Sequence, residues 1–260
     1  MFPRLLFPFL LTLLPTVAMA AMVEEPVKHT HEGVTFASLL VYDNAGASAR
    51  PAILMVPNWL GVTPQAVEMA KQVAGHDYVV LVADLYGETV RPKNANEAQQ
   101  AATFLRSNRP LLRARANNAL DALLAAGQKG GIDAKKTAAI GFCFGGGAVL
   151  ELARSGRPLH GVVSFHGNLD TPNSADAANI KGSVLVLHGA SDPFVPDAQV
   201  QAFETEMRAQ SNLDWQLVSF GGAVHSFTDP DANTPGKSQY HEKTAKRAFA
   251  MMRRFFGEIF

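Results

Sequence analysis

The sequence has little of three things that would place it in a specialised class of protein: cysteine, net charge and long apolar runs. Its 260 residues include one cysteine, Cys143, and 23 basic residues balance 23 acidic ones. One cysteine excludes an internal disulfide, so the thiol is either a packed core group or a reactive one. A chain this close to neutrality lacks the basic surface that nucleic acid or an anionic membrane attracts, so neither is expected as a partner.

An apolar run near the N-terminus, from Leu5 to Leu14, follows the basic residue Arg4 and precedes small residues that end at Ala20. Ten residues are too few to cross a bilayer, which needs about 20. The pattern is typical of a secretory signal peptide. We therefore expect cleavage after about Ala20 and a secreted or periplasmic chain without membrane attachment. Removing Arg4 leaves 22 basic and 23 acidic residues, a net charge of −1, in one domain over residues 21–260.

Motifs for metal ions and nucleotides are also missing. His29 and His31 form a pair with no third ligand nearby and no zincin motif, so we expect them on exposed chain. The glycine-rich segment "GGAVLELA" lacks the Lys-Ser/Thr of a phosphate-binding loop. The sequence therefore predicts no metal ion and no organic cofactor.

Along the rest of the chain, apolar β-rich segments alternate with amphipathic ones. Strands are expected in 33–43 and at 52–58, 78–87, 137–142, 161–167, 182–189 and 215–222, and helices at 64–75, 111–127, 198–210 and 243–260. Most of these strands are continuously apolar, as they are when helices cover both faces of a parallel sheet. The alternation predicts an α/β fold with one mostly parallel, doubly wound sheet in a single domain.

In such a sheet, ligands bind beyond the carboxyl ends of the strands. Cys143 lies there, in "GFCFG", between a predicted strand and a helix. Glycines two positions before and two after leave room for the sharp turn of a nucleophile elbow, and the helix N-terminus favours a thiolate. The alternative is a buried cysteine that packs as a small hydrophobic group.

A nucleophile of this kind needs a base, and the base needs an acid that orients it. Asp192 follows the strand at 182–189, and His225 follows the next strand. Nucleophile, acid and histidine thus occur in the order that the α/β-hydrolase arrangement requires. Alternatively, Asp192 caps the helix that begins near Pro196, and His225 is a solvated loop residue.

The segments "GFCFGG", "HGASDPFVP", "GAVHSF" and "ADLYG" together resemble the dienelactone hydrolase family, a cysteine-using branch of the α/β-hydrolase fold. The resemblance covers nearly all of the chain after residue 20. It implies a monomeric hydrolase of small esters or lactones without a cofactor, in which Cys143 is the nucleophile, His225 the base and Asp192 the acid.

One position departs from that family. Its prototypes carry a glutamate after the strand expected at 52–58, and this chain has Asn58 there. Because an amide cannot take a proton from a thiol, activation by that carboxylate is excluded. We expect instead that Cys143 rests as a thiolate paired with the imidazolium of His225.

The fold also predicts the remaining parts of the site. Backbone N–H groups of Phe144 and Trp59 are expected to form the oxyanion hole. A substrate pocket is expected from Asn58, Tyr86, His166, Phe194 and Phe227, although a hydrogen-bonded structural role for His166 and simple packing for the aromatic residues stay open. A structural role is expected for His188, and Arg91 is expected to be a solvated loop residue.

Functions of other classes compete with hydrolysis. The chain could be a non-catalytic scaffold that binds a small ligand, or a redox sensor that uses Cys143. Neither function needs an acid and a histidine in this order, which favours the hydrolase. Among enzymes, a peptidase of the same fold is the nearest alternative, but such peptidases usually use serine and a longer chain.

Overall fold

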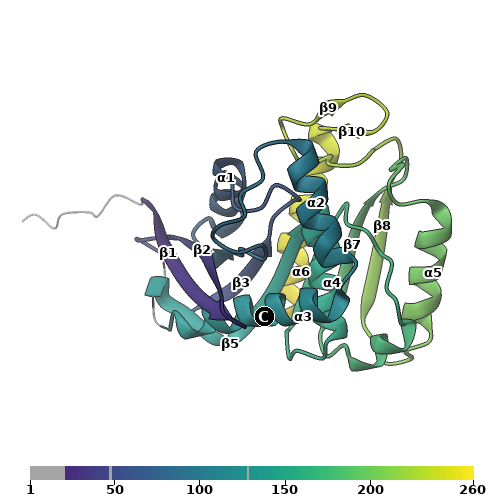
Figure 1. The fold of residues 1–260 in the computed structure, drawn as a ribbon. Helices are drawn as coiled ribbons and strands as arrows, with labels where there is room; N and C mark the ends of the chain where they lie inside the picture. The colour runs from purple at the N-terminus through teal and green to yellow at the C-terminus, as the bar shows by residue number, and fades with distance from the viewer. Residues whose placement is uncertain (1–20, 47–48, 128) are drawn as a thin grey trace, which may run out of the picture.

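Eight strands form one sheet through the middle of the molecule (Figure 1). The structure is a computed structural model and describes residues 21–46, 49–127 and 129–260. In chain order the strands are β1 (Met22–His31), β2 (Val34–Asp43), β3 (Arg50–Val56), β4 (Val79–Val82), β5 (Ile132–Phe142), β6 (Gly161–Phe165), β7 (Ser183–Gly189) and β8 (Trp215–Phe220). Their order across the sheet is β1-β2-β4-β3-β5-β6-β7-β8.

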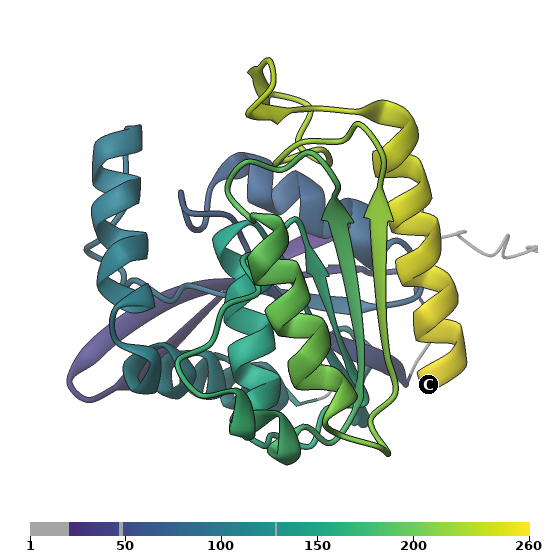
Figure 2. The same cartoon turned by 90° about the vertical axis from the view of Figure 1, so that its right-hand side faces the viewer.

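The six strands from β4 to β8 across the sheet are parallel, and β1 and β2 add an antiparallel hairpin at one edge. The prediction of a mostly parallel, doubly wound sheet in one domain is confirmed. Because the six strands are parallel, their carboxyl ends share one edge. Figure 2 shows β7 and β8 pointing to that edge, and the short β9 (Asn233–Thr234) and β10 (Ser238–Gln239) lie above it.

Helices cover both faces of the sheet. One face packs against α1 (Pro64–Ala74) and α6 (Glu242–Ile259), through apolar side chains such as Val73 and Phe256. The other face packs against α2 (Ala95–Arg106), α3 (Arg109–Ala125), α4 (Phe144–Arg154) and α5 (Asp197–Arg208), through side chains such as Leu105 and Val149. Burying each large side chain of this kind stabilises the fold by about 1.5–3 kcal/mol.

The two longest elements absent from the sequence-based prediction are β1 and α2. Strand β1 is polar and lies at the edge of the sheet, where its alternating half-buried side chains give a weak apolar signal. Helix α2 buries only Ala98, Ala102 and Leu105, and two of these are alanines. Its start is nevertheless marked, because the Asn94 side chain accepts the N–H of Glu97 as an N-cap.

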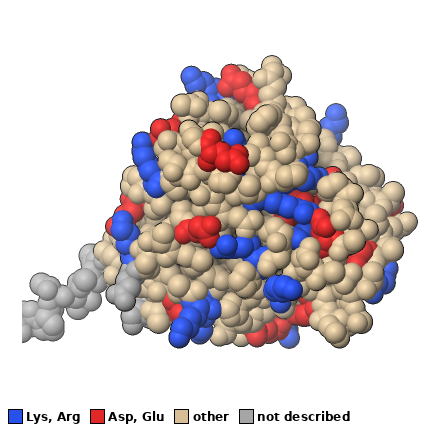
Figure 3. Space-filling model, turned by 60° about the horizontal axis from the view of Figure 1, so that its bottom comes forward, with Lys and Arg blue, Asp and Glu red and all other residues tan. Residues whose placement is uncertain are grey.

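The signal peptide expected over residues 1–20 lies outside the described residues. None of the helices in the described part of the chain combines the length and the hydrophobicity that crossing a bilayer requires. On the face shown in Figure 3, basic and acidic side chains are interspersed rather than gathered into a patch of one sign.

Candidate active site

The sheet brings the ends of its parallel strands together at one edge, and the predicted residues follow those ends. Trp59 comes shortly after β3, Cys143 after β5, Asp192 after β7 and His225 after β8. Because β5, β6, β7 and β8 are successive neighbours, side chains that are far apart in the sequence become adjacent at this edge. The observed strands end up to five residues before the predicted ends, which leaves these residues in loops.

Cys143 stands at a sharp turn between β5 and α4. Its backbone angles are φ 55° and ψ −118°, in a region that side-chain-bearing residues rarely adopt. A Cβ atom on Gly141 would lie 2.0 Å from the carbonyl oxygen of Gly145, and one on Gly145 would lie 2.0 Å from that of Val56. Glycine is therefore required on both sides of the turn. This strand–turn–helix geometry is that of a nucleophile elbow, and Cys143 as a residue is partly exposed there.

His225 and Asp192 form a buried hydrogen-bonded pair. The distance from His225 Nδ1 to Asp192 Oδ2 is 2.8 Å, and the two residues are 8% and 5% exposed. The other carboxylate oxygen accepts the N–H of Phe194 at 2.9 Å, which fixes the orientation of the carboxylate. Asp192 therefore does not cap α5, which starts without a side-chain cap, and His225 is not a solvated loop residue.

The backbone of His225 is held by the segment that includes β10. Its N–H donates to the carbonyl oxygen of Lys237 at 3.2 Å, and its own carbonyl oxygen accepts the N–H of Gln239 at 2.9 Å. The hydrogen bond from Nδ1 to Asp192 fixes the orientation of the buried ring. Because Nδ1 is hydrogen-bonded to Asp192, the ring nitrogen that forms the hydrogen bond with the Cys143 thiol is Nε2.

The thiol and the imidazole shift each other's pKa in opposite directions. Burial by itself raises the pKa of the Cys143 thiol, but the hydrogen bond and positive charge of His225 bring it below its ordinary value. Smaller contributions in the same direction come from the N–H of Phe144 and the charge of Arg106. Burial likewise disfavours protonated His225, yet its hydrogen bonds with Asp192 and Cys143 raise its pKa to about 10. Both shifts act in the direction that favours a thiolate paired with an imidazolium over two neutral side chains.

The two residues expected to form the oxyanion hole follow β5 and β3. Phe144 is the first residue of α4, where backbone N–H groups have no partner within the helix, and its N–H is hydrogen-bonded to the sulfur of Cys143. Trp59 lies in the loop after β3, which is shaped by Asn58: the Oδ1 of Asn58 accepts the N–H of Leu60 at 3.0 Å. The same loop is also held by Tyr86, whose hydroxyl donates to the carbonyl oxygen of Trp59 at 2.9 Å. Phe144 thus lies at a helix N-terminus, and Trp59 lies in a hydrogen-bonded turn.

A cavity of about 430 Å³ opens beside the thiol. Its size suits a small organic molecule. The residues that line it come from the β3 loop, α1, α2, the elbow and the loops after β6, β7 and β8: Asn58, Trp59, Leu60, Gln65, Gln99, Arg106, Cys143, Asn168, Phe194, Val195, His225, Ser226, Asp229, Asp231, Ala232 and Ser238.

Of the five residues expected in the substrate pocket, Asn58 and Phe194 line this cavity. The structure places Tyr86, His166 and Phe227 behind its wall. They are 7%, 2% and 0% exposed, because each side chain turns into the packing beneath the strand ends rather than toward the thiol. Packing therefore describes Tyr86 and Phe227 better than a place in the pocket, and a hydrogen-bonded structural role describes His166 better.

Of the cavity residues that were not predicted from the sequence, Arg106 is the one with a basic side chain. It was missed because α2 itself was not predicted. Its Nε is buried without a hydrogen-bond partner, and no ion pair forms between Arg106 and another described residue. Arg91, in contrast, is not a solvated loop residue, because it pairs with Asp84 at 2.9 Å and donates to the carbonyl oxygen of Gly87. The apolar spacing of α2 and its Asn94 cap were the signals that could have revealed the helix.

The remaining histidines that the sequence singled out lie outside the cavity. His29 and His31 belong to β1 rather than to exposed chain, and the His29 ring lies between Asn118 Oδ1 and Ser38 Oγ at 2.6 and 3.0 Å. His188 is buried at the end of β7. Within the described ranges, His, Cys, Asp and Glu side chains form no group of three or more that could hold a metal ion.

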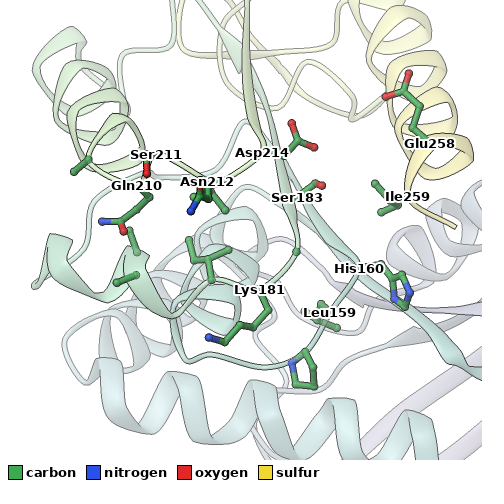
Figure 4. Close-up of a pocket in the computed structure, with 17 residues that line it drawn as sticks. Leu159, His160, Lys181, Ser183, Gln210, Ser211, Asn212, Asp214, Glu258 and Ile259 are labelled. Carbon is green, nitrogen blue, oxygen red and sulfur yellow. The ribbon is translucent and has the colours of Figure 1, made fainter.

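A second hollow, of about 850 Å³, lies at the opposite edge of the sheet (Figure 4). It is lined by residues next to the amino ends of β6, β7 and β8 and by the ends of α5 and α6. Its charged side chains, Lys181, Asp214 and Glu258, are spread around the rim and do not converge (Figure 4). None of the predicted site residues lies there, so the cavity beside Cys143 is the candidate active site.

Comparison with known proteins gives a consistent result. A model described as the dienelactone hydrolase family matches residues 37–260. An uncharacterized protein of Caenorhabditis elegans is 37% identical over 134 residues, which cover 50% of this chain and 84% of that protein. A carboxymethylenebutenolidase homolog of Mus musculus is 22% identical over 210 residues, which cover 80% of this chain and 83% of the homolog.

Among solved structures, similarity extends over almost the whole described chain. A dienelactone hydrolase-like promiscuous phosphotriesterase from metagenomic libraries is 37% identical, with a TM-score of 0.86. The match covers 92% of this chain and 99% of that one.

Proposed function

The chain belongs to the dienelactone hydrolase family, whose enzymes act on lactones and esters, and we propose that it cleaves small substrates of these classes by covalent catalysis at Cys143. His225 is the general base and Asp192 the acid that orients it. The observation that carries this proposal is the buried 2.8 Å pair of His225 and Asp192 beside the elbow thiol. A non-catalytic scaffold or a redox sensor has no need for that pair.

Acylation begins with attack of the Cys143 thiolate on the substrate carbonyl carbon. A C–S bond forms, and the carbonyl electron pair moves onto the oxygen, which the N–H groups of Phe144 and Trp59 then stabilise. Each such donor contributes about 3 kcal/mol to the transition state. When the oxyanion collapses, the C–O bond to the leaving group breaks, and protonated His225 gives that oxygen its proton.

Deacylation uses the same groups with water as the nucleophile. His225, now neutral, takes a proton from the water as the water attacks the thioester carbonyl. The C–S bond breaks, the acid product leaves and the thiolate–imidazolium pair is restored. Asp192 stabilises the imidazolium whenever His225 is protonated and keeps Nε2 directed toward the reaction.

Turnover of p-nitrophenyl acetate by the purified chain tests the proposed function. We expect steady release of p-nitrophenolate, with inactivation after alkylation of one thiol per chain. No turnover together with small-ligand binding would favour the scaffold. Reversible inactivation of the thiol by peroxide, with no esterase activity, would favour the sensor. Phosphotriesters form the second class to assay, because one of the proteins of similar structure is a promiscuous phosphotriesterase.

The cavity wall also suggests a preference among esters. Arg106 contributes a cation to the cavity and has no carboxylate partner among the described side chains, while the nearby Asp229 and Asp231 both accept hydrogen bonds from Gln65. An unpaired guanidinium attracts a carboxylate on the substrate and holds it through charge-assisted hydrogen bonds. The name of the mouse homolog also refers to a lactone with a carboxyl group. We therefore propose anionic esters or lactones as the preferred substrates.

Arg106→Gln should weaken binding of carboxylate-bearing esters selectively. A lost charge-assisted hydrogen bond of about 1.5–3 kcal/mol raises KM for an anionic aryl ester about tenfold to a hundredfold. Neutral p-nitrophenyl acetate serves as the control, and its KM should change by less than about threefold. Equal losses for both esters would show that Arg106 does not select charge.

Export completes the proposal. The leader pattern of residues 1–20 supports a mature chain that begins near residue 21 and acts in the periplasm or outside the cell. Cell fractionation of the full-length chain, followed by N-terminal sequencing, tests this. Retention of the leader on cytosolic protein would contradict it.

A further inference from the structure

His166 is a buried histidine that the proposed reaction does not use. It follows β6 directly, is 2% exposed and does not line the cavity beside Cys143. Its φ of 40° lies in the left-handed region, which costs a residue with a side chain about 1–3 kcal/mol. Cys143, which carries the thiol, and Ser226, which follows His225, also have positive φ values of 55° each. Three residues with strained backbone angles therefore lie after the carboxyl ends of β5, β6 and β8.

Both nitrogens of the His166 ring are hydrogen-bonded. Nδ1 accepts the backbone N–H of Cys143 at 3.2 Å, and the same N–H also donates to the carbonyl oxygen of Phe165 at 3.0 Å. Nε2 lies 2.8 Å from Oγ1 of Thr228. Because a backbone N–H can only donate, Nδ1 must be unprotonated, and the ring proton must therefore be on Nε2 and donate to Thr228. Thr228 is 3% exposed and lies three residues after His225 in the same loop. One ring thus connects the nucleophile turn to the loop that carries the base.

The connection requires a neutral ring. A proton on Nδ1 would face the N–H of Cys143 and add a second cation beside His225, whose ring centroid is 5.3 Å away. Burial, together with the charge of His225, holds the pKa of His166 well below its ordinary value. The groups that face it are Cys143 and His225, while Asp229 lines the small hollow that His166 also borders. The ring therefore remains neutral while His225 takes and gives protons.

We propose that His166 is a positioning residue that sets the relative placement of the Cys143 thiol and the His225 imidazole. It acts through the backbone N–H of Cys143 and the hydroxyl of Thr228, and it does not touch the substrate. Without the His166 ring, the N–H of Cys143 keeps its bond to Phe165, but the two buried hydrogen bonds that join the turn at Cys143 to the loop of His225 are lost. This inference rests on the proposed function only for its activity readout, because alkylation of the thiol reports the same geometry without turnover.

Three variants separate the two hydrogen bonds. Thr228→Val keeps the shape of the side chain and removes the acceptor, His166→Asn keeps a short acceptor toward Cys143 but does not reach Thr228, and His166→Phe removes both contacts. The matched control is Thr244→Val, which removes a similar contact, between Thr244 Oγ1 and the ring of His241, at the start of α6.

The measurements are kcat and KM for p-nitrophenyl acetate, the pH at half-maximal alkylation of Cys143, and Tm. We expect Thr228→Val and His166→Asn to lower kcat about threefold to tenfold with KM unchanged. His166→Phe should lower kcat about a hundredfold, because small displacements of reacting groups have effects of that size. All three should raise the alkylation half-point, whereas Thr244→Val should change only Tm.

Three results would overturn the proposal. A lower Tm with wild-type kcat and half-point in the Thr228 and His166 variants would show that the role is purely structural. A raised KM with unchanged kcat in His166→Phe would show that the ring binds substrate. A half-point that moves equally in Thr244→Val would show that the effect is not specific to His166. If the wild type lacks esterase activity but the half-point still shifts, the proposed function fails and the positioning role stands.

Discussion

Replacing Cys143 with alanine should lower kcat/KM for p-nitrophenyl acetate by a factor of about 10⁴ or more, because a nucleophile acts as a unit with its base and its loss removes the covalent route. The chain should remain folded, since the side chain is small and partly exposed at the turn. The measurement is steady-state hydrolysis with the far-UV spectrum and Tm as folding controls.

Cys143→Ser is the informative partner of that variant. A serine hydroxyl is held in the same elbow but does not form an anion beside His225 as a thiol does, so activity should fall well below that of the wild type yet stay above that of the alanine variant. Equal activity of Cys143→Ala and the wild type would show that Cys143 takes no part in the reaction. Because the chain has one cysteine, no other thiol can account for the activity that is lost.

Replacing His225 with alanine should stop turnover at the second half of the reaction. The thiol loses the imidazolium that lowers its pKa, so acylation slows at neutral pH. At pH values where the thiol still ionises, acylation should proceed but water is no longer activated. We expect a fall in kcat of about 10⁴-fold and one equivalent of p-nitrophenolate per chain, followed by a stall.

Mass spectrometry of the stalled protein provides the measurement, since the acyl group should remain on the peptide that contains Cys143. Asp192→Asn is the matched variant, because it keeps the ring and removes the charge that orients it, and its activity should lie between those of the wild type and His225→Ala. Sustained turnover in His225→Ala would show that another group acts as the base.

The proposed catalytic residues were accessible from the sequence because their positions follow from topology. Cys143, Asp192 and His225 each lie within five residues of the end of a strand that the sequence predicts. Once the strands are parallel, those positions must share an edge. The elbow added a local signal, since glycines at 141 and 145 are demanded by contacts of 2.0 Å with backbone.

The walls of the cavity were less accessible, for a physical reason. The position of a residue after a strand predicts the edge of the sheet at which it lies but not the direction of its side chain. Tyr86, His166 and Phe227 lie at the predicted edge, but their side chains are buried in the core. Arg106 reaches the cavity from α2, whose alanine-rich buried face gives little apolar contrast. The polar edge strand β1 was missed for the same lack of contrast, because its stability comes from pairing with β2.

Everything proposed for this site depends on one placement: the Cys143 thiol, the His225 imidazole and the Asp192 carboxylate must lie within hydrogen-bonding distance of one another, in that order. The rate of alkylation of the lone cysteine by iodoacetamide, followed against pH in the wild type and in His225→Ala, tests it most directly. The lowered thiol pKa predicts a wild-type half-point below the free-cysteine value of about 8.5, and burial predicts a half-point at or above that value in the variant. A wild-type half-point at or above about 8.5 that His225→Ala does not move would contradict the account.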